Sequence, residues 1–228
     1  MDVLLINDDG IESSRLKFAQ KELEKIANVW VVAPKRGMSG ASMSITVGSI
    51  DFEKIDNQIY VVDGTPVDCY LFAKYALKLK PDWVVSGVNM GLNIGMDIQY
   101  SGTYAVAKRA AMDSIDSIAF SASLLGEQTM TKYFLETFKH LIKVHPSDAY
   151  YVVNVNFPDD YLDYKGIRFT KSSYHDLSVS GKVVDNRFIT NRISLQDKVG
   201  KKKDNEIWAL KKGYTSITHT KFNRYIMF

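Results

Sequence analysis

The sequence predicts an α/β fold with a mostly parallel sheet between layers of helices. Short apolar runs at residues 3–6 and 29–33 are typical of strands that are buried on both faces of a parallel sheet. Between these runs, apolar residues recur at helical spacing among charged ones. A strand, a helix and a second strand within this length imply a right-handed parallel crossover. We therefore expect a Rossmann-like, three-layer domain at residues 1–158 and a β-rich C-terminal extension at residues 159–228.

The remaining elements follow from the same kinds of pattern. Ser13 or Ser14 is the expected N-cap of the first helix. A β-hairpin excursion is expected at about residues 45–63, with its first strand over residues 45–52. Further strands are predicted at residues 83–86, 115–121, 151–155, 167–170, 182–193 and 214–218, and further helices at residues 104–112 and 131–144.

A capping pattern opens one more helix. Thr65 is an N-cap candidate, Pro66 suits the first helical position, and Asp68 lies three residues after the cap. We interpret this pattern as structural, and Cys69 just beyond it as a core residue. The apolar residues of this segment that we expect to face the core are Leu71, Phe72, Tyr75 and Leu79.

The composition excludes several classes of protein. The 29 basic and 26 acidic residues leave a net charge of +3 without a basic stripe, which argues against a nucleic-acid scaffold. A single cysteine excludes an internal disulfide and a multi-cysteine zinc cluster, and it fits a reducing compartment. No apolar run approaches the roughly 18 residues of a membrane span, and no signal segment precedes the first strand. We therefore expect a cytoplasmic protein without a membrane partner.

The first candidate site directly follows the first strand, where open α/β sheets bind their ligands. Asp8 and Asp9 repel each other in a dry site unless a cation compensates them, and Mg²⁺ or Mn²⁺ is the natural partner of two such carboxylates. A solvated turn is the alternative interpretation. Because Gly10 is the single glycine in residues 7–14, the dinucleotide fingerprint is absent, and neither NAD nor FAD is expected.

Two later loops contain further candidates. Residues 34–44 form a hydroxyl-rich loop that includes Ser39, and such loops can bind anions or metals. Residues 87–97 have a glycine at every fourth position, which lets a backbone approach a ligand closely. Asn89 and Asn93 in this second loop can offer carbonyl oxygens to a metal or amide groups to a phosphate. A plain turn is again the alternative.

A phosphate site is also predicted where the next helix begins. Ser101, Gly102 and Thr103 lead into an alanine-rich helical segment. The free amides and the positive dipole end of a helix start attract a phosphate group. These three residues are therefore candidates for binding phosphate oxygens.

These motifs together resemble the SurE family, the survival-protein 5′/3′-nucleotidases. They occur nearly end to end in the family's order, which makes a chance resemblance improbable. The similar residues are 7–11, 31–34, 39–40 with Ser42, 44–46, 64–66 with 68–69, 86–89 with Gly91 and Asn93, 100–103, 154–156, and 213–214 with 216–218.

The resemblance implies a metal-dependent phosphomonoesterase that hydrolyses nucleoside 5′- and/or 3′-monophosphates, with one divalent cation, Mg²⁺ or Mn²⁺, per subunit. It also implies a homodimer or homotetramer, for which residues 159–228 are the expected oligomerisation arm. The implied metal ligands, of which the two aspartates are also the catalytic candidates, are Asp8, Asp9, Ser39 and Asn89. The residues expected to bind the other phosphate oxygens are Asn93, Ser101, Gly102 and Thr103. Either water or an aspartate carboxylate would attack the phosphorus.

The chain departs from the family pattern at two places. After Thr103 the family usually runs to Glu-Gly, whereas this chain has Lys108, Arg109 and Ala110 in a helix, which a packing role would explain. Met38 stands where the family often has arginine, and the loss of a basic residue there would weaken the attraction of the substrate.

Three other classes of protein compete with this interpretation. A haloacid-dehalogenase-type phosphatase would need an acid two residues after Asp8, where Gly10 stands. A phosphoacceptor receiver domain would need an aspartate at the end of a middle strand, where Ser86 and Gly87 stand. A non-catalytic nucleotide-binding α/β module is the alternative that the sequence leaves open.

Overall fold

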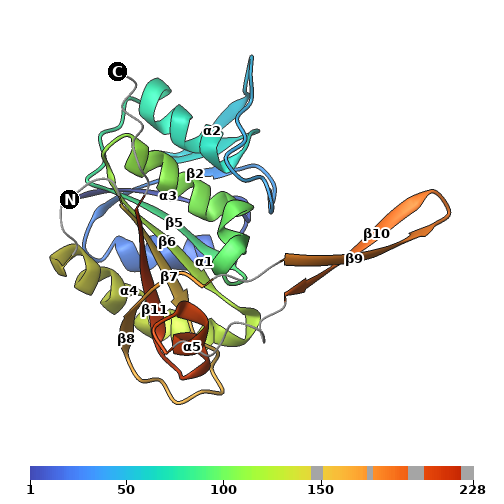
Figure 1. Ribbon diagram of the computed structural model, residues 1–228. Coiled ribbons are helices and arrows are strands. Elements are labelled where there is room, and N and C mark those ends of the chain that lie inside the picture. The colour runs from blue at the N-terminus through green and yellow to red at the C-terminus, as the bar shows by residue number, and fades with distance from the viewer. Residues whose placement is uncertain (145–150, 174–176, 195–202, 222–228) are drawn as a thin grey trace, which may run out of the picture.

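The structure of the protein is a computed structural model that describes residues 1–144, 151–173, 177–194 and 203–221. It contains a nine-stranded sheet with the order β3-β4-β2-β1-β5-β6-β7-β11-β8, and a separate two-stranded sheet of β9 and β10 (Figure 1). Strands β4, β2, β1, β5, β6 and β7 run parallel to one another, whereas β3 and β11 are antiparallel to their neighbours β4 and β7. The predicted α/β class with a mostly parallel sheet is therefore confirmed.

The strands are β1 (Asp2–Ile6), β2 (Asn28–Pro34), β3 (Phe52–Asp56), β4 (Ile59–Val62), β5 (Trp83–Met90), β6 (Asp116–Ala122), β7 (Tyr151–Phe157), β8 (Ile167–Thr170), β9 (Leu177–Val184), β10 (Arg187–Ser194) and β11 (Thr215–Lys221). The helices are α1 (Ser14–Leu23), α2 (Pro66–Leu71), α3 (Gly102–Met112), α4 (Glu127–Val144) and α5 (Glu206–Lys211), together with the π-helix η1 (Phe72–Ala76) and the 3-10 helices η2 (Gly95–Gln99) and η3 (Leu124–Gly126). None of the helices in the described part of the chain is long and apolar enough to cross a membrane.

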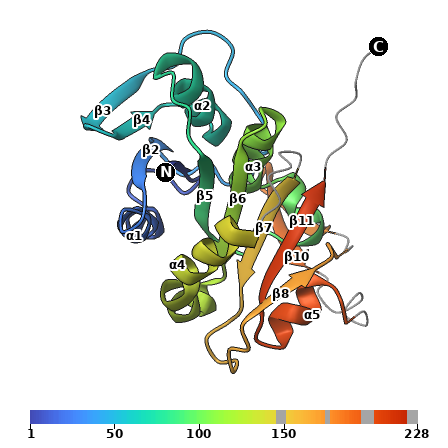
Figure 2. The same cartoon turned by 90° about the vertical axis from the view of Figure 1, so that its left-hand side faces the viewer.

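The central strand β1 shows why the fold has three layers. Val3 and Leu5 belong to the core on the face that α1 and α4 cover, whereas Leu4 and Ile6 belong to the core under α2 and α3 (Figure 2). All four side chains are at most 1% exposed. Because β1 pairs in parallel with both β2 and β5, the carboxyl ends of these strands meet at one edge of the sheet.

The hairpin excursion is present, but its first strand is displaced. Strand β3 begins at Phe52, so residues 45–51 form no strand, and the prediction of a strand over residues 45–52 is wrong. Asp68 holds this segment instead of a strand ladder. The backbone N–H and the hydroxyl of Thr46 donate to the Asp68 carboxylate at 3.0 and 2.7 Å.

The predictions around two helices differ in their outcome. Thr65 caps α2 with both halves of a capping box in place, as predicted, whereas Ser13 stands at the N-cap of α1 without a side-chain capping bond. Tyr75 is 61% exposed, so the prediction that it faces the core is wrong. The chain changes from α2 into the wider turn of η1, which brings Ala73 to the core in its place. Cys69 is fully buried, as predicted.

Strand β5 is longer than the sequence pattern indicated. It ends at Met90, so Gly87 and Asn89 belong to a strand rather than to the predicted loop. A Cβ atom on Gly87 would lie 2.3 Å from the carbonyl oxygen of Phe120 on β6, so this glycine is required by strand packing and not by a ligand. The register between β5 and β6 shifts at the same place, between Ser86 and Asn89.

Arg109, one of the two departures from the family pattern, has a packing role. It forms an ion pair with Asp113 just after α3 and lies over the Tyr70 ring of α2 at 5.6 Å. Lys74 and the Tyr70 hydroxyl contact the same carboxylate at 2.7 and 2.8 Å. These contacts attach α3 to the α2 segment.

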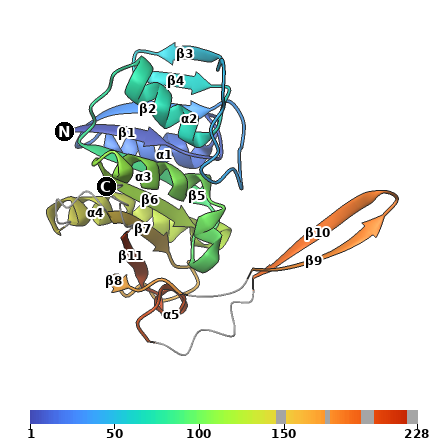
Figure 3. The same ribbon diagram turned by 45° about the horizontal axis from the view of Figure 1, so that its top comes forward.

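The C-terminal part of the chain contributes both to the main sheet and to a projecting hairpin. Strand β11 pairs with β7 on one side and with β8 on the other, so these two strands extend the nine-stranded sheet. Strands β9 and β10 pair only with each other along eight residues and project away from the body of the protein (Figure 3). Part of the segment after residue 158 is therefore continuous with the Rossmann-like sheet.

Candidate metal and phosphate site

The predicted site residues converge at the carboxyl ends of β1 and β5. The loops after these strands, the loop after β2 and the start of α3 enclose a cavity of about 250 Å³. Its wall contains five of the eight predicted residues, which are Asp8, Ser39, Asn89, Asn93 and Ser101. The other wall residues are Gly40, Met90, Gly91, Leu92, Asp97 and Tyr100. Asp9, Gly102 and Thr103 do not line this cavity, but each is a chain neighbour of a predicted site residue.

Asp8 is the most constrained side chain of the site. It is 3% exposed, and the Thr103 hydroxyl donates to its Oδ1 at 2.5 Å. Burial raises the pKa of Asp8 to about 6, and the neighbouring charge of Asp9 adds to this increase, while the Thr103 bond opposes it. A Cβ atom on Gly102 would lie 2.9 Å from the Cβ of Asp8, so a glycine is needed where α3 begins beside this carboxylate.

Asp9 is less buried and is oriented by the neighbouring strand. The backbone N–H of Met90 donates to its Oδ2 at 3.2 Å. Burial raises the pKa of Asp9, whereas the Met90 bond and the positive charge of Arg15 oppose this increase. Each of the two carboxylates thus has a hydrogen-bond donor from a neighbouring element, and the charge of Asp9 raises the pKa of Asp8.

The hydroxyl-rich loop is attached to the site from two sides. The backbone N–H of Met38 donates to the carbonyl oxygen of Asp8 at 2.7 Å. On the other side, the backbone N–H and the hydroxyl of Ser42 donate to the carbonyl oxygens of Tyr100 and Gln99 at 3.1 and 2.7 Å. Ser39 lies between these two attachments as an exposed residue in the cavity wall.

The two asparagines of the site are held in different ways. The Nδ2 of Asn89 donates to the carbonyl oxygen of Gly91 at 2.8 Å, so its amide oxygen is the group that remains for a ligand. Asn93 is 4% exposed, and its Nδ2 donates to the Ser121 hydroxyl at 2.8 Å. Its backbone N–H and carbonyl oxygen are bound by the Asn156 side chain at 2.8 and 3.0 Å. Asn93 is therefore anchored to β6 and β7 beneath the cavity.

The start of α3 presents backbone donors to the site. Ser101 is the N-cap, and its hydroxyl accepts a hydrogen bond from the backbone N–H of Tyr104 at 3.0 Å. Thr103 is fully buried, and its hydroxyl hydrogen is committed to Asp8. The positive end of the α3 dipole therefore lies next to the Asp8 carboxylate and the cavity.

The residues of this site fit a hard divalent cation. They supply carboxylate, amide and hydroxyl oxygens, the ligand set that Mg²⁺ and Mn²⁺ prefer. The two adjacent acids also resist ionisation because burial raises both pKa values, and a bound cation would compensate their charge. In the described ranges, no group of three or more His, Cys, Asp or Glu residues is arranged so that it could hold a metal ion.

Arg15 is a supporting residue that the sequence did not reveal. It is 2% exposed, and its Nη1 donates to the carbonyl oxygens of Asn89 and Ala122 at 2.8 and 2.7 Å. Its Nη2 donates to the carbonyl oxygen of Ser123 at 2.9 Å and forms an ion pair with Glu127 at 2.6 Å. In the sequence, the single indication of this role is that Arg15 lies next to the apolar positions of the first predicted helix.

Glu206 is the second supporting residue that the sequence did not reveal. It is 1% exposed at the start of α5, and burial raises its pKa. Its Oε1 accepts from the backbone N–H of Gly95 at 2.6 Å, and from the N–H and hydroxyl of Ser173 at 3.0 and 2.9 Å. Because Gly95 opens η2, which leads to Ser101, Glu206 attaches the wall of the cavity to the C-terminal part of the chain.

The fold and the site together define a class of protein. It is an α/β protein in which oxygen-bearing side chains suited to a divalent cation meet the N-terminus of a helix at the carboxyl edge of a parallel sheet. Residues 3–178 match the model of the family described as "Survival protein SurE", and the chain belongs to that family.

Curated proteins and a solved structure agree with this assignment. The chain is 34% identical to the 5′/3′-nucleotidase SurE of Wigglesworthia glossinidia brevipalpis, over 96% of this chain and 90% of that protein. It is 36% identical to the 5′-nucleotidase SurE of Vibrio vulnificus (strain CMCP6), over 95% of this chain and 88% of that protein. The crystal structure of the SurE protein from Aquifex aeolicus superimposes with a TM-score of 0.84 at 31% identity, covering 99% of this chain and 95% of the other.

Proposed function

We propose that this SurE-family protein is a divalent-metal-dependent phosphomonoesterase that hydrolyses nucleoside 5′- and/or 3′-monophosphates to nucleoside and phosphate. The observation that carries the proposal is the adjacent pair of the buried Asp8 and the partly buried Asp9, placed with the Asn89 amide oxygen and the Ser39 hydroxyl beside the start of α3. The curated relatives are named nucleotidases and align along nearly the whole chain.

In this proposal, Asp8, Asp9, Ser39 and Asn89 hold the cation. When bound, Mg²⁺ or Mn²⁺ neutralises charge on the phosphate oxygens, which otherwise repel a nucleophile. The Thr103 bond and the close packing of Gly102 hold Asp8 in one orientation before the substrate arrives.

The phosphate oxygens that do not face the cation have donors of their own in this proposal. Ser101 and the backbone amides of Gly102 and Thr103 begin α3, where the helix dipole favours an anion. Asn93 lies in the wall of the same cavity and is fixed by β6 and β7. Because these groups are already in place before the substrate binds, they can orient the phosphate without a rearrangement of the site.

Hydrolysis by purified protein tests the enzyme proposal against a non-catalytic nucleotide-binding module. We expect 5′- and 3′-monophosphates of the common nucleosides to be hydrolysed with Mg²⁺ or Mn²⁺ and not with a chelator. Asp9→Asn should remove most of this activity, whereas Asp51→Asn, which changes an exposed aspartate outside the cavity, should not. Tight nucleotide binding without turnover, or full activity of Asp9→Asn, would favour the binding module.

We also propose a cytoplasmic homodimer or homotetramer in which the β9–β10 hairpin is an oligomerisation arm. Val183, Phe188 and Ile189 support this role, because these large apolar side chains are 73%, 66% and 43% exposed on the projecting hairpin. Light scattering after size-exclusion chromatography should give a dimer or tetramer for the full chain. Replacing all three residues by serine should give smaller species, and an unchanged mass would reject the arm.

A further inference from the structure

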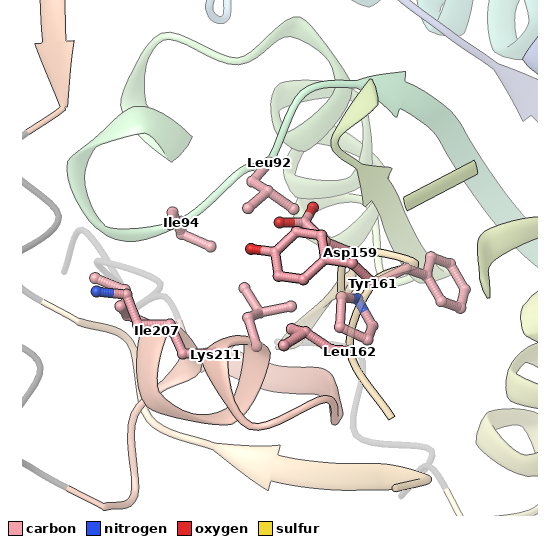
Figure 4. A pocket seen from close by; sticks show the side chains of 10 residues that line it. Leu92, Ile94, Asp159, Tyr161, Leu162, Ile207 and Lys211 are labelled. Atoms are coloured by element: carbon pink, nitrogen blue, oxygen red, sulfur yellow. The ribbon is translucent and has the colours of Figure 1, made fainter. Parts of the chain in front are cut away.

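We propose that an apolar pocket next to the phosphate site binds the base of the nucleotide substrate. This inference rests on the phosphomonoesterase function proposed above, and it specifies how that site distinguishes a nucleotide from other phosphate esters. The pocket, of about 110 Å³, lies between the loop after β5, the loop after β7 and helix α5. Its main side chains are Leu92, Ile94, Tyr161, Leu162, Ile207 and Leu210 (Figure 4).

The apolar pocket adjoins the phosphate site through shared wall residues. Leu92 lines the phosphate cavity, the apolar pocket and an open cavity between them of about 500 Å³. The open cavity shares Met90 and Gly91 with the phosphate site and Asp159 with the apolar pocket. A nucleotide with its phosphate at Asp8 can thus place its sugar over the open cavity and its base in the apolar pocket.

The pocket has the walls that a flat aromatic ring requires. Ile94, Ile207 and Leu210 form a small buried cluster that is between 2% and 6% exposed, with Leu92 packed against it. Figure 4 shows the Tyr161 ring beside Leu92 and Asp159, with Leu162 and the residues of α5 on the facing wall. A dry cavity of about 150 Å³ admits a whole benzene ring. This pocket is smaller, at about 110 Å³, but it is open on one side, so the ring of a base can insert into it in part. Tyrosine is a usual stacking partner of bases.

Asp159 supplies a polar group at the edge of the pocket. Its carboxylate accepts hydrogen bonds from the Ser123 hydroxyl and from the Tyr161 hydroxyl. An ionised carboxylate has about four acceptor positions, so two hydrogen bonds leave capacity for a donor on the ligand. The exocyclic amino groups of adenine, cytosine and guanine are such donors, and we infer that these bases are favoured over uracil.

A pair of substrates that differ only in the base tests the inference. We expect the kcat/KM of adenosine 5′-monophosphate to exceed that of ribose 5-phosphate by about tenfold or more, because stacking on one aromatic ring contributes about this factor. Tyr161→Ala should reduce this ratio about tenfold, whereas Tyr161→Phe should retain it. Tyr75→Ala is the matched control, because Tyr75 is an exposed tyrosine on η1 outside all three cavities and should leave the ratio unchanged.

The outcomes separate this inference from the proposed function. A ratio near one in the wild-type protein, or an equal ratio in Tyr161→Ala, overturns the base pocket while leaving the phosphomonoesterase intact. If neither substrate is hydrolysed, the proposed function fails, and calorimetric titration with adenosine decides the pocket. Binding that Tyr161→Ala weakens supports the inference, and no binding to the wild-type protein overturns it.

Asp159→Asn tests the preference for amino-bearing bases. The ratio of kcat/KM for adenosine and uridine monophosphates should fall in this variant, since the strongest acceptor for the amino group is lost. An unchanged ratio would remove Asp159 from the recognition of the base.

Discussion

Asp8 and Glu206 are two of the almost completely buried carboxylates in the described part of the chain, and their surroundings differ in a way that separates structure from function. Glu206 at the start of α5 is 1% exposed and is surrounded by donors from Gly95, Ser173 and Thr218. Asp8 at the end of β1 is 3% exposed, accepts from the Thr103 hydroxyl, and has a second acid as its chain neighbour. Glu206 is thus compensated by the protein itself, whereas Asp8 is left for an external cation to compensate.

The comparison is most strongly tested by removing the charge of Asp8. Asp8→Asn keeps the shape of the side chain and an acceptor for Thr103, but it removes a ligand charge from the proposed cation site. We expect kcat/KM for nucleoside monophosphates to fall by about 10³-fold or more with Mg²⁺ or Mn²⁺ present. Steady-state kinetics over a range of cation concentrations measures this loss. Activity within a few-fold of the wild-type value would show that the charge of Asp8 has no catalytic purpose.

The next largest effect is expected on stability when Glu206 is removed. Glu206→Ala leaves the N–H groups of Gly95 and Ser173 without their acceptor, and we expect the free energy of unfolding to fall by about 2–4 kcal/mol. Urea denaturation measures the change. Glu53→Ala, at an exposed glutamate of β3, is the control and should stay within about 0.5 kcal/mol. A comparably small change in Glu206→Ala would contradict the structural role.

Glu206 is expected to stabilise the fold, whereas the charge of Asp8 should destabilise it when a chelator has removed the metal. The pH dependence of the free energy of unfolding should reveal this effect. The folded state raises the pKa of Asp8 from 3.8 to about 6, so it binds this proton more tightly than the unfolded state. The destabilisation of the folded state by ionised Asp8 is therefore absent below about pH 4. It grows as the pH rises to about 6 and reaches its full size above that pH. Without metal, Asp8→Asn should therefore be more stable than the wild-type protein by about 2–3 kcal/mol at pH 7.5.

Denaturation curves at several pH values measure this difference between the variant and the wild-type protein. The difference should vanish near pH 4, and added Mg²⁺ or Mn²⁺ should reduce it by stabilising the wild-type protein. A difference that does not depend on pH would show that burial of the Asp8 charge is not its source.

The smallest expected effect concerns the one hydroxyl that orients Asp8. Thr103→Val removes the donor while keeping the shape, and we expect kcat/KM to fall about tenfold with a stability loss of about 1–2 kcal/mol. Thr137→Val is the matched control, because Thr137 is 1% exposed on α4 and its hydroxyl has no hydrogen-bond partner among the described residues. That control should be neutral or slightly stabilising. If the two variants had the same kcat/KM and the same stability, the hydrogen bond from Thr103 to Asp8 would contribute to neither activity nor stability.

The sequence predicted the features of this protein that depend on neighbouring residues. Asp8 and Asp9 follow a strand whose burial is visible in four consecutive apolar residues, so their place at the sheet edge followed from local pattern. The capping box of Thr65 and Asp68 was equally local. The SurE resemblance implied that Asn89 joins the aspartates, and the parallel pairing of β1 with β5 is the physical reason that it lies near them.

Features that depend on contacts between residues far apart in the chain could not be predicted from the sequence. Glu206 looks like an ordinary charged residue until β11 and η2 bring its donors to it, with Gly95 lying 111 positions earlier in the chain. Thr103 was expected to bind phosphate, but the fold directs its hydroxyl to Asp8. Tyr75 was misplaced because a helical pattern does not show where an α-helix widens into a π-helix.

The buried Arg15 has a consequence for which substitutions this fold can accept. One planar guanidinium donates to the carbonyl oxygens of Asn89 on β5, of Ala122 at the end of β6 and of Ser123 just beyond it, while it also pairs with Glu127. A lysine has three donors at one point and cannot span acceptors on two strands and a loop. A single Arg15→Lys exchange should therefore leave the Asn89 or the Ser123 carbonyl oxygen without its donor, so this position should accept lysine poorly.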